Sequence, residues 1–199
     1  MFTVDPYYQH EIRTAHGLIE EIKMGTLVTR APTLDASPLP FLLYRGRGAL
    51  GTLIGHMASA NRQWRTLAED AEVLVTFTGP QAYVSASWYK TGPRVPTWYY
   101  TAVHVHGRAR LVEDADGLRK ILQDTVAAFD APGTGWRPDA DYVTRLLPGI
   151  IGIEIEIIKL EAQQRLGQES PDIDHNAVRR RLRNGDLLQQ QVAQKMIPR

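Results

Sequence analysis

The sequence predicts a mainly β, α+β fold in which helices flank an antiparallel sheet or barrel. Residues 73–78 form an apolar run rich in β-branched side chains, which is typical of a strand. Over residues 151–157, isoleucines alternate with glycine and glutamate, as expected for a strand with one buried face. Short connections join consecutive candidate strands, and such connections favour antiparallel pairing.

Apolar periodicity and breaks rich in glycine and proline place the remaining elements along the chain. Strands are predicted at residues 26–29, 39–44, 50–54, 73–78, 82–87, 98–112 and 151–157, with a turn at 32–38 and a hairpin turn at 45–48. Helices are predicted at residues 9–23, 61–68, 115–129, 140–147, 174–183 and 187–196. We expect residues 1–168 to form one domain. Residues 169–199, whose helices are polar with few core residues, are expected to form a C-terminal helical appendage.

Composition restricts the chemistry and the partners. The 199 residues contain no cysteine, which excludes disulfides, thiolate metal sites and cysteine nucleophiles. The formal net charge is +1, from 23 basic and 22 acidic residues, whereas domains that bind nucleic acid are usually clearly basic. The first ten residues show no signal-peptide pattern, and the longest apolar stretch, 150–158, is too short to cross a membrane. We therefore expect a cytoplasmic protein with no membrane segment.

Polar side chains on two candidate strands raise the alternatives of a metal site and of paired catalytic carboxylates. His104 and His106 share one strand face and could chelate a metal, but a third ligand such as His56 would be needed. Glu154 and Glu156 also share a face, for which exposure to solvent is a better explanation than acid–base catalysis. We therefore predict no metal site.

A basic run, Arg179–Arg181 with Arg183, lies on the first of the two C-terminal helices. Such a run could contact the phosphates of DNA. The balanced total charge instead favours a solvated helical face that pairs with neighbouring acidic residues. DNA is therefore a partner with weaker support.

The segment from Gly55 to Trp64 leads from the end of a strand, through small residues, into a short helix. Unpaired backbone N–H groups at a helix start carry partial positive charge, and His56, Ser59 and Asn61 could add donors for a phosphate. The alternative is that Ser59 or Asn61 simply caps the helix. The spacing leaves both interpretations open.

Aromatic and hydroxyl side chains gather at residues 83–89 and 95–100. Ser85 and Ser87 are expected on one strand face, beside aromatic rings that could stack on a flat, partly polar ligand. Taken singly, Trp88 and Trp98 are better explained as members of an aromatic core.

Together these stretches resemble the PaiB-like family of FMN-binding proteins, often described as negative transcriptional regulators. Their order and spacing agree with the family over roughly residues 1–165, and four linked motifs are far more specific than any one of them. The matching segments are Gly55-His56-x-Ala58-x-Ala60-Asn61-x-Gln63-Trp64, Gly79-Pro80-x-Ala82-Tyr83-Val84-Ser85-x-Ser87-Trp88-Tyr89, Val95-Pro96-Thr97-Trp98-x-Tyr100 and Val103-His104-x-His106-Gly107.

The resemblance implies a split β-barrel of the kind shared with pyridoxamine-phosphate oxidases and flavin reductases, in a homodimer with two equivalent FMN sites between subunits. The FMN phosphate is then expected near residues 56–63 and the isoalloxazine ring near 85–89 and 96–98. His104 and Tyr99 are catalytic candidates that the sequence supports only weakly. The expected cofactor-binding residues are His56, Met57, Ala58, Asn61, Gln63, Ser85, Ser87, Trp88, Thr97 and Trp98.

Two positions depart from the family pattern. Tyr99 stands where the family usually has asparagine, and its bulkier side chain is expected to alter the flavin contacts. The family's Lys-Leu-Ser-Gln-Asn segment reads Arg165-Leu166-Gly167-Gln168-Glu169 here, and Glu169 adds a negative charge.

Three functions are consistent with these motifs. The first is an FMN-dependent oxidoreductase that acts on a small molecule. The second is a flavin-binding transcriptional regulator of the PaiB type, and the third is a barrel that binds haem or another planar ligand instead of FMN. The two departures from the family pattern keep the third open.

Overall fold

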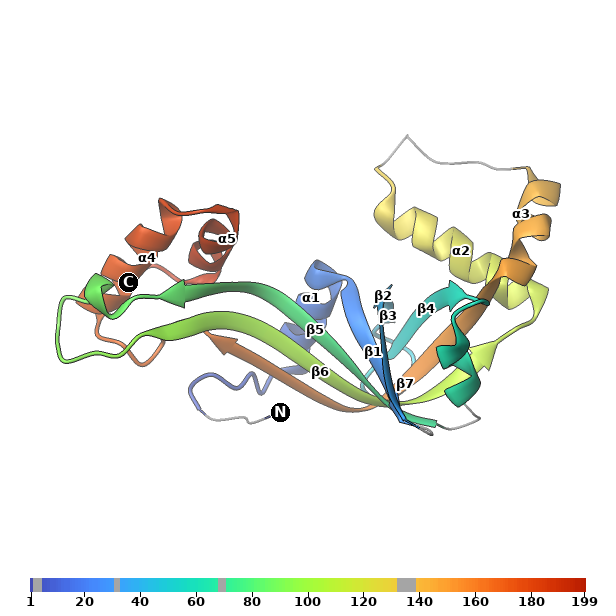
Figure 1. Cartoon of the computed structure of the whole chain (residues 1–199), viewed down its shortest axis with the longest axis horizontal. Helices are drawn as coiled ribbons and strands as arrows, with labels where there is room; N and C mark the ends of the chain where they lie inside the picture. Colours follow the sequence, from blue (N-terminus) through green and yellow to red (C-terminus); the bar gives the residue numbers. More distant parts are fainter. Residues whose placement is uncertain (2–4, 31–32, 68–70, 132–138) are drawn as a thin grey trace. The chain divides into compact units, whose positions relative to one another are not determined.

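The structure is a computed structural model that describes residues 1, 5–30, 33–67, 71–131 and 139–199 (Figure 1). Seven strands form one sheet in the order β2-β1-β5-β6-β7-β4-β3. The strands are β1 (Met24–Arg30), β2 (Leu34–Pro40), β3 (Leu42–Tyr44), β4 (Thr52–Ala58), β5 (Ala71–Val84), β6 (Thr97–Val112) and β7 (Ile150–Arg165). The α-helices are α1 (Ile12–Ile22), α2 (Ala115–Phe129), α3 (Ala140–Leu146), α4 (Asp172–Arg183) and α5 (Leu187–Lys195), and the 3₁₀ helices are η1 (Arg62–Thr66), η2 (Ala86–Trp88) and η3 (Leu147–Gly149).

The predicted class, a mainly β fold with flanking helices, is confirmed. The registers of β1 with β2 and β5, of β3 with β4, and of β4 with β7 are all antiparallel. The isoleucine alternation does mark a strand, because Ile153, Ile155 and Ile157 are buried on β7.

Several boundaries differ from the prediction. The turn expected at 32–38 is largely strand β2, which pairs with β1 from Met24↔Pro40 to Arg30↔Leu34; Pro32 lies outside the described residues. An edge strand tolerates proline, since its outward N–H groups need no partner. β5 continues through Gly79-Pro80, and the strand expected to reach residue 87 ends at Val84. The helix expected at 61–68 is the 3₁₀ helix η1, and Ala68 lies outside the described residues.

The chain divides into two compact units. Unit 1 contains Met1–Leu18, Thr78–Val103 and Glu161–Arg199, and unit 2 contains Ile19–Phe77 and His104–Leu160. In unit 2, Phe41 meets Phe77 edge to face, with ring centroids 6.1 Å apart. Gly25 lies against the same ring, because a Cβ there would be 2.9 Å from Phe77 Cε1.

The core of unit 1 joins the ends of β5 and β6 to α4 and α5, which lie beside that end of β5 in Figure 1. The expectation that these helices hold few core residues is wrong, because α4 and α5 supply four of the nine residues of this core. The boundary expected at residue 168 stays a prediction. The core residues are Ala82, Val84, Tyr99, Leu166, Val178, Leu182, Val192, Ala193 and Met196.

Candidate functional site

The segment expected to hold a phosphate, residues 56–63, lies in unit 2 and runs from the end of β4 into η1. The side-chain oxygen of Asn61 accepts a hydrogen bond from the backbone N–H of Gln63 at 3.0 Å, and its Nδ2 donates to Ser37 Oγ at 2.8 Å. Asn61 therefore caps η1, which has only five residues. The structure favours the capping interpretation over an anion site built on the helix start.

Gln63 is buried and fixes η1 to the neighbouring strands. Its Nε2 lies 3.1 Å from the carbonyl oxygen of Leu27, 3.2 Å from Thr29 Oγ1 and 3.2 Å from the carbonyl oxygen of Asp35. Its Oε1 is buried without a hydrogen-bond partner. Because an amide oxygen is an acceptor, it would repel a phosphate oxygen instead of binding it.

His56, Met57 and Ala58 follow one another on β4, so their side chains alternate between its faces. Met57 points into the core and is 2% exposed, so its side chain is closed to a ligand. His56 lies opposite Gly152 of β7 and is half-buried. Burial lowers the pKa of His56, so its imidazole is neutral at pH 7.

The positive charge of this segment comes from Arg62 and Arg65, both exposed on η1. The guanidinium of Arg65 stacks over Trp64, with its Cζ 5.4 Å from the ring centroid. The sequence motif did not indicate either arginine, because the donors expected for a phosphate were at the helix start and not charged side chains along the helix.

The residues expected at the flavin ring lie in unit 1, around η2 and the start of β6. Ser85 caps η2 by accepting a hydrogen bond from the N–H of Ser87, and their hydroxyl oxygens are 2.9 Å apart. Both serines lie just beyond the end of β5, and not on a strand face as expected. Their hydroxyls nevertheless lie together. Trp88 is partly buried against the unit 1 core, as the core interpretation expected.

Trp98 does not belong to a core. It is 52% exposed and meets Tyr83, 45% exposed, edge to face with ring centroids 6.1 Å apart. Thr97 precedes it and is half-buried. This part of unit 1 therefore presents an exposed aromatic pair, and Tyr83 lies two residues along the chain from Ser85.

Tyr99 has an environment that its place in the motif did not indicate. It is fully buried in the core beneath α4 and α5, and a Cβ at Gly167 would lie 2.1 Å from its hydroxyl oxygen. Burial raises the pKa of Tyr99 far above its ordinary value, so the phenol stays neutral. Enclosed in this way, Tyr99 is a core residue rather than a catalytic candidate or a flavin contact.

His104 lies in unit 2 on the half-buried face of β6 with His106, while Val105 faces the core, as predicted. Among the described residues, no group of three or more histidine, cysteine or acidic side chains could hold a metal ion. His104 stays a prediction as a catalytic candidate.

Glu154 corrects the expectation of a solvated strand face. It is 4% exposed and pairs with both Arg47, from the turn after β3, and Arg110 of β6. A buried carboxylate held by two guanidinium groups is a structural ion triad, because its charge is already compensated.

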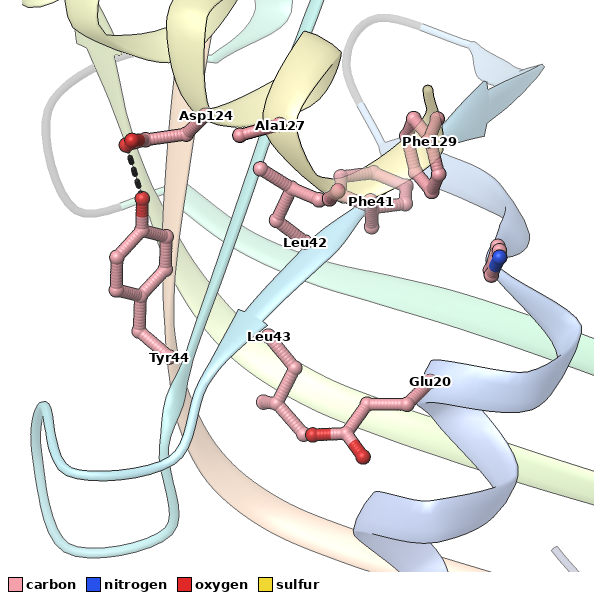
Figure 2. A pocket seen from close by; sticks show the side chains of 10 residues that line it. Glu20, Phe41, Leu42, Leu43, Tyr44, Asp124, Ala127 and Phe129 are labelled. Atoms are coloured by element: carbon pink, nitrogen blue, oxygen red, sulfur yellow. Dashed lines mark hydrogen bonds between the residues drawn. The ribbon is translucent and has the colours of Figure 1, made fainter. Parts of the chain in front are cut away.

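A cavity of about 450 Å³ in unit 2 lies among the end of α1, β3 and α2 (Figure 2). Tyr44 donates a hydrogen bond to Asp124, and the ammonium of Lys23 lies 5.3 Å from the ring centroid of Phe129. Burial and Asp124 raise the pKa of Tyr44 to about 12. No sequence motif indicated this pocket, because its lining comes from three separate stretches of the chain.

A family of known proteins matches most of this chain. Residues 1–159 match the model of a protein family described as "Putative FMN-binding domain". The chain belongs to this FMN-binding family. The resemblance found from the motifs is therefore confirmed, and so is FMN as the cofactor.

A curated relative and two solved structures extend the comparison. The protease synthase and sporulation protein PAI 2 of Bacillus subtilis is 33% identical over 172 residues, covering 83% of this chain and 81% of that protein. The FAD and heme binding protein of Mycobacterium smegmatis superposes with a TM-score of 0.61 at 19% identity, covering 86% and 80% of the two chains. The flavocytochrome Anf3 of Azotobacter vinelandii has a TM-score of 0.61 at 15% identity, covering 80% and 69%. At these identities the two structures show the fold, a split β-barrel.

The described side chains fit a flavin at the ring end. The adjacent hydroxyls of Ser85 and Ser87 can donate to ring carbonyls and nitrogens, and the exposed Trp98 offers an apolar face.

None of the helices in the described part of the chain is long and apolar enough to cross a membrane.

Proposed function

We propose that this member of the FMN-binding family is a homodimeric oxidoreductase that uses FMN to act on a small molecule. The observation that carries the proposal is the exposed surface of unit 1, where Ser85, Ser87 and Trp98 lie in the segments that match the family motifs. Bound FMN would supply the redox chemistry, and the chain's own side chains would bind and orient it.

Each expected residue takes a role that its environment allows. Ser85, Ser87, Thr97 and Trp98 would contact the isoalloxazine ring through their side chains, and Trp88 would contribute mainly through its backbone. At the phosphate end, neutral His56 would donate a hydrogen bond and Ala58 would act through its backbone N–H group. Met57, whose N–H group faces β7, would hold β4 in place. Asn61 and Gln63 would shape this end indirectly, by fixing η1.

Arg62 adds a charge that the expected set lacked. Its guanidinium is exposed beside the segment expected to hold the phosphate, and an arginine binds a phosphate with charge-assisted hydrogen bonds. We therefore include Arg62 at the phosphate end.

The homodimer is supported by the exposed pair of Tyr83 and Trp98. Aromatic side chains at this degree of exposure are typical of surfaces that a partner subunit or a ligand covers. A second subunit on this surface would enclose the flavin ring and exclude water from it.

An absorption spectrum of the purified protein, followed by titration with FMN, tests cofactor binding. We expect blue absorption bands from the flavin and quenching of FMN fluorescence. Anaerobic mixing with NADH or NADPH should then bleach those bands, with a dimer seen by light scattering. A colourless protein that leaves FMN fluorescence unchanged contradicts the proposal, and a Soret band would favour haem.

The second candidate is a flavin-binding regulator that contacts DNA. Its specific support is the end of α4, where Arg180, Arg181 and Arg183 are exposed. Arg179 differs from these three, because its Nε donates to the carbonyl oxygens of Ala193 and Met196.

A mobility shift at low salt tests DNA binding. The triple variant Arg180→Ala, Arg181→Ala and Arg183→Ala should abolish the shift while retaining bound FMN. The absence of any shift with the wild-type protein at low salt contradicts direct DNA binding.

A further inference from the structure

A buried carboxylate on α4 holds the loop between η2 and β6. Asp174 is 0% exposed, and its Oδ1 accepts hydrogen bonds from the backbone N–H groups of Lys90 at 2.6 Å and Thr91 at 2.9 Å. Its Oδ2 accepts from Thr91 Oγ1 at 2.6 Å and from an Arg94 guanidinium nitrogen at 2.9 Å. Four donors from one short loop therefore converge on one side chain.

Arg94 extends this network toward the aromatic segment. Its guanidinium carbon lies 5.6 Å from the centroid of the Tyr89 ring, while the same group pairs with Asp174. Burial alone would raise the pKa of Asp174, but the hydrogen bonds from Thr91, Lys90 and Arg94 lower it to about 2. The carboxylate is therefore ionised at neutral pH, and a strongly coordinated anion of this kind orders the loop around it.

Asp174 is itself held in a fixed position. The next residue, His175, is 2% exposed and contacts the carbonyl oxygens of Gly167 at 3.2 Å and Ile197 at 2.9 Å. On the same helix, Val178 and Leu182 are fully buried in the core of unit 1. The helix that carries the carboxylate thus belongs to a packed core.

The loop that Asp174 holds has residues of the expected flavin site at both ends. Ser85 and Ser87 precede it, and Thr97 and Trp98 follow it. The placement of these two groups therefore depends on the course of residues 90–94 as well as on the pairing of β5 with β6. A loop that is already ordered before the ligand arrives binds it more tightly, because less conformational entropy is lost on binding.

We propose that Asp174 is a positioning residue for the flavin ring, and that α4 and α5 fix the ring-binding segments of this chain. The proposal rests on the proposed FMN binding. It assigns a role to residues 172–199, which lie beyond the part of the chain that matches the family model.

The test compares Asp174→Asn with Asp172→Asn as a matched control. Both substitutions remove one negative charge from the first turn of α4. The Asp172 side chain, however, is 73% exposed, and its Oδ1 lies 3.7 Å from a guanidinium nitrogen of Arg199. In Asp174→Asn the amide nitrogen would face two of the four loop donors, so the loop loses part of its anchor and the ion pair with Arg94 without a change of side-chain size. We would measure the FMN dissociation constant by fluorescence, the visible circular dichroism of bound FMN and the thermal unfolding of each full-length protein.

We expect Asp174→Asn to weaken FMN binding at least about tenfold and to change the visible dichroism of bound FMN. Asp172→Asn should stay within about twofold of wild type. A milder variant, Thr91→Val, removes the hydroxyl that donates to Asp174 and accepts from Arg94, but leaves the carboxylate in place. It should weaken binding about threefold, which covers the case in which Asp174→Asn does not fold.

Two results separate this proposal from the one on which it rests. If the wild-type protein binds no FMN, both proposals fail. If the wild type binds FMN while folded Asp174→Asn and Thr91→Val bind it equally well with an unchanged visible dichroism, FMN binding stands and the positioning role is overturned. A lower unfolding temperature with native FMN affinity would likewise assign Asp174 to stability alone.

Discussion

Replacing Gly167 by alanine probes the packing of Tyr99 under the C-terminal helices. Gly167 has a φ of +77°, a conformation that costs a non-glycine residue about 1–2 kcal/mol. The added Cβ would also lie 2.1 Å from the hydroxyl oxygen of Tyr99 and 2.6 Å from its Cζ, and overpacking of a core costs about 1–3 kcal/mol. We therefore expect Gly167→Ala to lower the free energy of unfolding by about 2–5 kcal/mol.

Urea denaturation followed by circular dichroism measures this loss. Gly17→Ala is the matched control: Gly17 lies in α1, nothing is within 4 Å of its added Cβ, and alanine should stabilise a helix by about 0.5–1 kcal/mol. Adding Tyr99→Phe to Gly167→Ala removes the closest clashing atom and should restore about 1 kcal/mol. If Gly167→Ala is as stable as wild type, or Tyr99→Phe restores nothing, the close packing of these two residues is refuted.

Three further predictions concern the site and its support. Tyr99→Phe alone should leave the FMN dissociation constant and any turnover within about twofold of wild type, because the phenol is enclosed; a larger kinetic effect would return Tyr99 to the catalytic candidates. Arg62→Ala should weaken binding of FMN but not of riboflavin, which lacks the phosphate, in parallel fluorescence titrations; equal losses for both ligands would contradict a phosphate contact. Asp174 has a lowered pKa in the folded chain, so its stabilising effect is complete above its ordinary value near 3.8 and is lost as the pH falls to about 2. Acid unfolding curves of wild type and Asp174→Asn should therefore converge over that interval, and parallel curves would argue against the lowered pKa.

Much of the sheet could be predicted because its signals are local. Isoleucine alternation marks β7, and the alternation of valine with His104 and His106 marks β6. The same period of two places Tyr99 on the buried side with Val103 and Val105. The alternation of side chains along β6 indicates that Tyr99 is buried, whereas the family motif had suggested a flavin contact.

Other features depend on contacts between distant parts of the chain. Asp174 meets Thr91 across 83 positions, and no local pattern distinguishes it from the exposed Asp172 of the same turn. The helices α4 and α5 have a polar composition, yet Val178, Leu182 and Val192 suffice for a core once strands are beside them. Burial of this kind follows from packing, which sequence periodicity alone does not indicate.

The position of Glu154 affects which strand pairing the chain can adopt. β4 and β7 pair with Ile54 opposite Glu154, and the neighbouring Ile153 and Ile155 point into the core. A slip of β7 by one residue would turn both isoleucines outward and carry the carboxylate inward, away from Arg47 and Arg110. The unpaired charge would make that misaligned sheet costly, so the triad disfavours this alternative alignment of β4 with β7.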